Sequence, residues 1–157
     1  MRVGIVADSH DNLPQIRKAL DLFRDEGIET VLHAGDFVAP FALKPLVESG
    51  LRLIAVFGNN DGEREGLRKL LPALQEGPIS FGLGGKKFVM AHDIAALSKP
   101  ERTAADIVVV GHSHEAQIEE DRGQIIINPG ELGGWLSGAS TLAVLDIDGA
   151  KAEIRTL

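Results

Sequence analysis

Seven side chains of three types could together bind metal ions. They are histidines, aspartates and one asparagine, grouped in short motifs along the chain: Asp8, His10, Asp36, Asn59, His92, His112 and His114. Imidazole, carboxylate and amide groups offer nitrogen and oxygen ligands without sulfur, which suits Mn²⁺, Fe, Zn²⁺, Co²⁺ or Ni²⁺. Seven ligands are too many for one tetrahedral ion and suit two ions about 3.5–4 Å apart that share a carboxylate. The sequence therefore predicts a dinuclear metal site.

Each motif follows a segment that is predicted to be a short buried strand. These segments are mostly apolar and rich in β-branched residues, and they span residues 2–7, 30–34, 51–57, 86–91 and 106–110. The carboxyl ends of strands in an open α/β sheet meet at one edge, where ligands bind. A glycine directly before Asp36, Asn59 and His112 lets the backbone turn tightly and approach an ion. We therefore expect the motifs to converge on one edge.

Amphipathic helices alternate with the first three strands, which indicates a parallel βαβαβα arrangement. Asp11 or Asn12 is expected to cap the first helix. The second helix is expected over Pro40–Glu48, and Asp61 could cap the third. This order implies an α/β fold.

The second half of the chain is predicted to form meandering, mostly antiparallel strands. Gly84-Gly85 is a hairpin signal, and turn residues separate further strands at 116–120, 124–128, 141–147 and 150–155. No linker, repeat or low-complexity tract interrupts the chain. We therefore expect one domain over residues 1–157.

The composition excludes several classes of protein. The absence of cysteine excludes a disulfide framework and Cys-ligated zinc. A formal net charge of −7 argues against an extended nucleic-acid surface. The first apolar run stops at Asp8, too short for a signal peptide, and no segment has the length of a membrane span. We expect a cytoplasmic protein with no membrane partner.

Taken in order, the metal-ligating motifs resemble the signature of the metallophosphoesterase (calcineurin-like phosphoesterase) family. They read Asp8-x-His10, Gly35-Asp36, Gly58-Asn59, a single His92 and Gly111-His112-x-His114. The short chain and the Asn60-Asp61 pair after Asn59 look most like the compact bacterial and archaeal phosphodiesterase branch. The resemblance runs from residue 4 to about 130. It implies a mixed-sheet α-β-β-α sandwich with the site at the carboxyl ends of the strands.

The resemblance also implies how the seven ligands are shared between two metal ions. Asp8, His10 and His114 would hold the first ion, Asn59, His92 and His112 the second, and Asp36 would bridge them. A water shared by the ions would be deprotonated near neutral pH and attack phosphorus as a metal-bridging hydroxide. Mn²⁺ is the expected metal, with Ni²⁺, Fe, Zn²⁺ or Co²⁺ as alternatives. The implied substrate is a small phosphoester.

Three positions depart from the family pattern. Many members have a histidine where this chain has Asn60. Because an amide cannot act as a general acid, leaving groups that need no proton should be favoured, and phosphodiesters are predicted over alkyl phosphomonoesters. Asp93 stands where relatives usually have glycine, and Glu131 where close relatives commonly have serine. The roles of both, and with them the choice of substrate, stay open.

Some residues near the motifs have two interpretations. Asn60 and Asp61 are the predicted catalytic residues. Asn60 would contact the substrate, and the alternative is a plain turn residue. Asp61 would orient a neighbouring group, and the alternative is an N-cap of the third helix. His33 is expected to be structural or to lie behind the ligands. Trp135 is expected to pack against the sheet edge, with an aromatic wall over the site or a subunit contact as alternatives.

The leading functional hypothesis is therefore a dinuclear metal-dependent phosphodiesterase. The alternatives are a phosphomonoesterase or nucleotidase, and a non-catalytic protein-binding scaffold of the same fold. The presence of His10, His92, His112 and His114 argues against the scaffold, in which ligand histidines are replaced. Whether the chain forms a homo-oligomer stays open.

Overall fold

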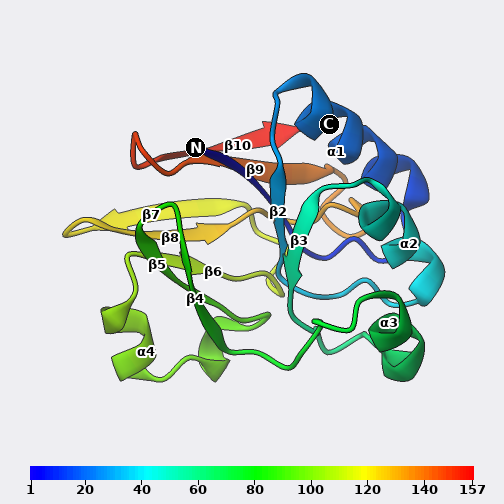
Figure 1. Cartoon of the computed structure of the whole chain (residues 1–157), viewed down its shortest axis with the longest axis horizontal. Coiled ribbons are helices and arrows are strands. Elements are labelled where there is room, and N and C mark those ends of the chain that lie inside the picture. Colours follow the sequence, from blue (N-terminus) through cyan, green and yellow to red (C-terminus); the bar gives the residue numbers. More distant parts are fainter.

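The computed structural model, which describes residues 1–157, stacks two β-sheets face to face between two layers of helices (Figure 1). The helices are α1 (Leu13–Asp25), α2 (Pro40–Glu48), α3 (Arg64–Leu70), the 3₁₀ helix η1 (Ile94–Ala96) and α4 (Lys99–Ala104). The strands are β1 (Arg2–Val6), β2 (Thr30–His33), β3 (Arg52–Ala55), β4 (Ile79–Leu83), β5 (Lys86–Met90), β6 (Ile107–Val109), β7 (Gln117–Asp121), β8 (Gln124–Asn128), β9 (Thr141–Asp146) and β10 (Lys151–Thr156). The predicted α-β-β-α sandwich is confirmed.

The first sheet has the strand order β10-β9-β1-β2-β3. β1, β2 and β3 run parallel, as the alternation of strands and helices predicts, and β9 and β10 add an antiparallel pair at the other edge. Asn12 caps α1 by accepting a hydrogen bond from the backbone N–H of Gln15 at 3.4 Å. The predicted bounds of α2 are confirmed.

The second sheet has the order β4-β5-β6-β8-β7. The predicted antiparallel hairpins are confirmed for β4–β5 and β7–β8, and β9–β10 forms another in the first sheet. The sequence does not predict that β5, β6 and β8 run parallel to one another. The chain crosses from β5 to β6 through α4, which makes these two strands parallel. Because α4 has only six residues, it gives no helical periodicity in the sequence. β7 pairs antiparallel with β8 at the outer edge, which lets β8 return beside β6.

Three apolar clusters hold the layers together. One lies between the first sheet and α1–α3, around Phe23 and Leu43, and a second joins the two sheets through residues such as Ile5, Phe88 and Ile127. A third lies on the outer side of the second sheet around Val108 and includes Leu97 and Ala105, which flank α4. Each fully buried aliphatic or aromatic side chain stabilises the fold by roughly 1.5–3 kcal/mol. β1 is buried along Val3–Val6, so it lies at the centre of the fold.

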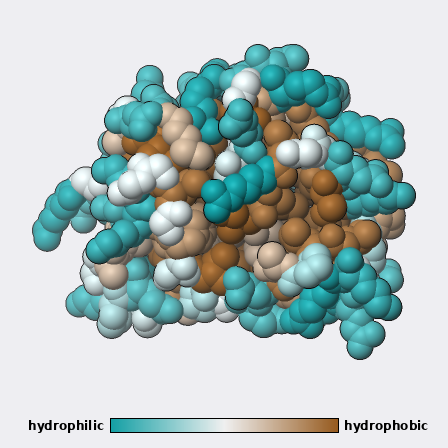
Figure 2. Space-filling model, viewed as in Figure 1, coloured by the Kyte–Doolittle hydropathy of each residue, from teal (hydrophilic) through white to brown (hydrophobic).

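Hydrophobic residues gather in the middle of one face, where β3 and β4 lie, and hydrophilic residues surround them (Figure 2). β3 and β4 are the edge strands of the two sheets. Leu53 and Ile79 on these strands are only partly buried, so the interior reaches the surface there. No helix is long and apolar enough to cross a bilayer.

Candidate metal centre

The loops that follow β1, β2, β3, β5 and β6 meet at the carboxyl ends of these strands, as predicted. They bring together all seven residues of the metal-ligating motifs through one connected set of contacts: Asp8, His10, Asp36, Asn59, His92, His112 and His114. Two groups within this set have ligand atoms close enough to share an ion, namely Asp8 with His10 and His114, and Asp8 with Asp36 and His92.

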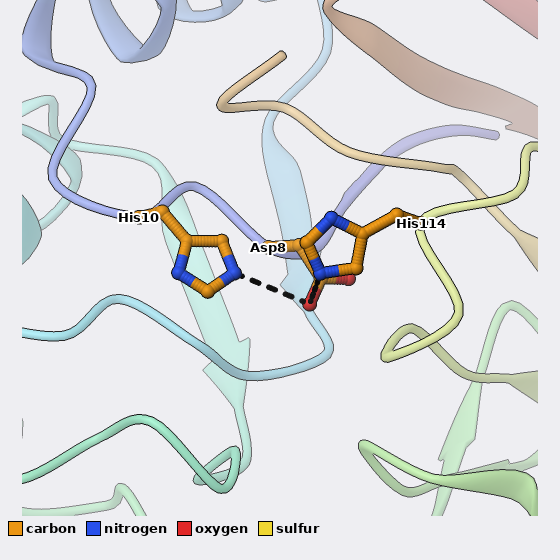
Figure 3. A group of neighbouring side chains, drawn as sticks. All are labelled: Asp8, His10 and His114. Atoms are coloured by element: carbon orange, nitrogen blue, oxygen red, sulfur yellow. Dashed lines mark ion pairs between the residues drawn. The ribbon is translucent and has the colours of Figure 1, made fainter. Parts of the chain in front are cut away.

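The first group points its polar atoms at one place (Figure 3). The Oδ1 atom of Asp8 lies 3.8 Å from Nε2 of His10 and 3.4 Å from Nε2 of His114. Asp8 is fully buried, yet its Oδ1 atom has no hydrogen-bond partner, and neither has the buried Nε2 atom of His10. Buried polar atoms without partners are rare in folded proteins and call for an ion or water.

Asp36 belongs to the second group and also approaches His10 of the first. Its Oδ2 atom is 3.5 Å from Nε2 of His10 and 3.4 Å from Nε2 of His92. Burial opposes ionisation of this carboxyl group, but His92 and two hydrogen bonds from Asn60 outweigh it and hold its pKa well below the usual range. Asp36 is therefore an anion at neutral pH.

The side-chain carbonyl of Asn59 faces the other two histidines. Its Oδ1 atom lies 2.9 Å from Nε2 of His92 and 2.9 Å from Nδ1 of His112. Nδ1 of His92 lies 2.8 Å from the carbonyl oxygen of Ala34, which can only accept, so Nδ1 carries the proton and donates. This hydrogen bond leaves the Nε2 lone pair of His92 free for a ligand.

Carboxylates dominate the electrostatics of the centre. The pKa of His10 is raised, chiefly by its interaction with Asp8. Burial lowers the pKa of His92, but the Asp36 carboxylate outweighs burial and raises it overall. The carboxylates therefore attract positive charge to this place.

The backbone is strained at the ligands themselves. Five residues have positive φ angles: Asp8 (52°), His10 (41°), Asp36 (63°), His112 (70°) and His114 (61°). Such angles are uncommon outside glycine and cluster at functional sites, where the surrounding structure enforces them. Hydrogen bonds from the N–H groups of Asp8 and His10 to the β2 loop hold this geometry. Gly58 must be glycine, because a Cβ there would lie 2.0 Å from Oδ1 of Asp36.

The two predicted catalytic residues both contact Asp36. Asn60 donates from its side chain to Oδ2 and from its backbone to Oδ1, each at 2.8 Å. Asp61 is buried and accepts from the N–H groups of Asp36, Val38 and Gly58 at 3.1, 2.8 and 2.7 Å. Its interpretation as an N-cap is wrong, because α3 starts at Arg64 after Glu63. Asp61 instead ties the loops after β2 and β3 together.

Two acidic residues whose roles the sequence left open lie beside ligand histidines. Oε1 of the fully buried Glu131 is 3.4 Å from Nδ1 of His114. Asp93 accepts from the N–H of Ala95 at 2.8 Å, which begins η1, and lies 3.9 Å from Nε2 of His112. A cavity of about 250 Å³ opens beside His112 and Asp93. The contact between Glu131 and His114 could not be predicted from the sequence, in which Glu131 is notable only because it departs from the family pattern.

The remaining histidine, His33, stays outside the centre. Its Nδ1 atom accepts from the N–H of Gly35 at 3.2 Å, so Nε2 carries the proton and donates to Oγ of Ser9 at 3.1 Å. Its ring stacks on Phe37 at 3.7 Å between centroids. Complete burial lowers the pKa of His33 to about 3, which keeps it neutral.

The residues fit bound divalent metal. Nitrogen and oxygen donors converge, two of the buried donor atoms lack partners, and the carboxylates are ionised or paired with histidines. The candidate centre thus has the composition of a nitrogen- and oxygen-ligated metal site.

Comparisons with known proteins agree with this geometry. Residues 1–150 match the model of the calcineurin-like phosphoesterase superfamily domain. The chain is 39% identical to a phosphodiesterase of Methanocaldococcus jannaschii, over 100% of this chain and 98% of the relative. It superposes with a TM-score of 0.89 on the structure of a novel archaeal phosphodiesterase, at 37% identity and 100% coverage of both chains.

More distant structures share the fold. Vps29 of Entamoeba histolytica complexed with Zn²⁺ matches with a TM-score of 0.73 at 21% identity, covering 100% of this chain and 98% of Vps29. The family model, the archaeal relatives and the ligand geometry agree, and the chain belongs to the calcineurin-like phosphoesterase superfamily.

Proposed function

We propose that this protein is a metal-dependent phosphodiesterase. The observation that carries the proposal is the meeting of the complete set of metal-ligating motifs around buried donor atoms that have no partner, Oδ1 of Asp8 and Nε2 of His10. The 39% identity to an archaeal phosphodiesterase over the whole chain supports the same activity.

Two ions, most simply Mn²⁺, would occupy the centre. Asp8, His10 and His114 would hold one ion, Asn59, His92 and His112 the other, and Asp36 would lie between them. The proximity of Asp8, His10 and His114 supports the first set, and the contacts of Asn59 with both histidines support the second. The nearly equal distances from Oδ2 of Asp36 to His10 and His92 support its role as the bridge. When bound, divalent ions lower the pKa of a water and neutralise phosphoryl oxygens.

The protein's own residues position the ligands. The carbonyl of Ala34 fixes the ring of His92 in the tautomer with a free Nε2 lone pair. Asn60 orients the carboxylate of Asp36 through two hydrogen bonds, and Asp61 fixes the backbone on either side of it. These contacts keep the donor atoms close without help from an ion, so little ordering is needed on binding.

The position of Asn60 favours diesters as substrates. Its amide has no acidic proton to give to a departing alkoxide. Esters with an acidic alcohol, which leaves without protonation, should therefore react faster than alkyl phosphomonoesters.

The direct test is hydrolysis of bis(p-nitrophenyl) phosphate and p-nitrophenyl phosphate by purified protein with Mn²⁺ or Ni²⁺. We expect turnover of the diester to exceed that of the monoester. Faster turnover of the monoester would instead identify a phosphomonoesterase. Folded protein that hydrolyses neither ester with any of several metals would refute the proposed function.

A further inference from the structure

Trp135 is the most conspicuous residue that the metal chemistry leaves unexplained. It is 66% exposed, and the neighbouring Leu136 is 80% exposed. The predicted packing of Trp135 against the sheet edge is therefore wrong. Tryptophan is highly buried on average and is enriched at interfaces, because burial of its large aromatic surface is favourable.

Hydrogen bonds to the side chain of Glu131 hold the loop that carries Trp135. The carboxylate of Glu131 accepts hydrogen bonds from the backbone N–H groups of Trp135 at 2.8 Å, Leu136 at 3.1 Å and Ser137 at 2.8 Å. Oγ of Ser137 donates a further bond at 2.8 Å. The buried side chain of Glu131 thus organises the loop through these hydrogen bonds.

The same loop is fastened to the segment that carries Asp8 and His10. The N–H of Gly133 donates to the carbonyl of Asp8 at 2.9 Å, and the side chain of Asn12 donates to the carbonyl of Gly133 at 2.7 Å. Nε1 of Trp135 donates to the carbonyl of His10 at 3.0 Å. The indole is therefore fixed directly beside a ligand of the candidate metal centre.

The hydrogen bond to His10 also decides what the indole can offer a ligand. Nε1 is the only polar atom of the side chain, and it is already used. What remains exposed is aromatic surface, which favours planar π systems through stacking worth about 1–3 kcal/mol. An indole held in place before binding loses little entropy when a ring stacks on it.

We propose that Trp135 is the stacking surface for a planar aromatic or heteroaromatic substituent of the substrate. The preferred substrates are then aryl or nucleoside phosphodiesters, whose phosphate lies at the metal centre while one ring contacts Trp135. This inference rests on the proposed phosphodiesterase function and narrows its substrate class.

The chain offers a direct binding assay, because Trp135 is its only tryptophan and it has no tyrosine. Intrinsic fluorescence therefore reports Trp135 alone. With Mn²⁺-loaded protein, we expect diphenyl phosphate to change the emission saturably, at a concentration about tenfold lower than the concentration at which diethyl phosphate competes. No saturable change with diphenyl phosphate would overturn the proposal.

Variants separate stacking from general hydrophobicity. Inhibition of bis(p-nitrophenyl) phosphate hydrolysis by the two phosphates gives an affinity ratio for each protein. We expect Trp135→Leu to reduce the preference for diphenyl phosphate from about tenfold to under about threefold, and Trp135→Phe to keep most of it. Leu136→Ala, which removes exposed apolar surface from the same loop, serves as the matched control and should keep the full preference. An unchanged preference in Trp135→Leu would overturn the stacking role.

The two proposals fail in different ways. Absence of hydrolysis with every metal refutes the phosphodiesterase function, whatever the fluorescence shows. Hydrolysis with equal affinity for diphenyl and diethyl phosphate leaves the phosphodiesterase function intact and refutes only the role of Trp135.

Discussion

Two buried groups of polar side chains lie at the carboxyl ends of β1 and β2, and they differ in how fully their hydrogen-bonding atoms are used. In the group around His33, both ring nitrogens have partners, Ser9 and the N–H of Gly35, and the ring stacks on Phe37. In the metal-ligating group, Oδ1 of Asp8 and Nε2 of His10 have none. The first group is complete within the chain, whereas the second leaves two buried polar atoms that an ion or water must satisfy.

Residue type alone therefore does not distinguish a structural histidine from a ligand. His33 and His92 both lie at the ends of strands and are both buried. In His92, Nδ1 binds the backbone and Nε2 faces the carboxylate of Asp36. In the neutral His33, both ring nitrogens are occupied by hydrogen bonds within the chain.

Asp36→Asn compared with His33→Gln should give the sharpest contrast. Loss of the bridging carboxylate should reduce diester hydrolysis by about 100- to 1000-fold, because an amide neither shares charge between two cations nor opposes their repulsion. His33→Gln should keep most of the activity. Steady-state rates under saturating Mn²⁺, with circular dichroism to verify folding, test this. Equal losses of activity in the two variants would contradict the assignment of Asp36 as a ligand and His33 as a structural residue.

Bound metal should stabilise the folded protein only through the metal-ligating group. At a free Mn²⁺ concentration 100 times the dissociation constant, the free energy of unfolding should rise by about 2.7 kcal/mol per site. Thermal unfolding with and without Mn²⁺ measures this, and a chelator should reverse it. Asp8→Asn should abolish most of the shift. A shift that survives in Asp8→Asn would place the ion elsewhere.

The group around His33 should make the free energy of unfolding depend on pH. The pKa of His33 is about 3 in the folded protein and 6.5 for a solvated histidine, so the unfolded state binds the extra proton between these values. His33 should therefore contribute a fall in the free energy of unfolding of the metal-free protein of about 1.4 kcal/mol per pH unit as the pH drops from 6.5 towards 3. Urea unfolding at several pH values should show this slope in the native chain and a smaller one in His33→Gln. Identical slopes would contradict the burial of a neutral His33.

Asn60→Ala should have the smallest effect. It removes the side-chain hydrogen bond to Oδ2 of Asp36 but keeps the backbone bond to Oδ1. Loss of one such contact behind a ligand typically weakens metal binding about tenfold. Isothermal titration with Mn²⁺ measures the change. A loss as large as that of Asp36→Asn would mean that Asn60 contacts the metal or substrate directly.

The sequence predicts the convergence of the ligands because strand ends and glycine-preceded motifs are local features. Asp8-x-His10 and Gly111-His112-x-His114 follow recognisable buried strands, and parallel strands end at one edge. The hairpins that turn residues indicate are present, but the parallel pairing of β5, β6 and β8 is not predicted, because α4 is too short to show a periodic pattern.

Contacts between residues distant in sequence account for the other errors. Asp61 resembles an N-cap from its neighbours, but two of its three partners, Asp36 and Val38, come from the preceding loop. Trp135 contacts a loop more than a hundred residues earlier, so neither its exposure nor its hydrogen bond could be inferred from residue type. Tertiary packing, which the local sequence does not encode, decided these positions.

The number of metal ions bound per chain shows whether Asp36 holds two ions together. Purified protein saturated with Mn²⁺ and freed of excess metal should contain two ions per chain by elemental analysis, and Asp36→Asn should contain fewer. A folded wild-type chain that retains none, or that retains the same number as Asp36→Asn, would contradict a centre bridged by Asp36.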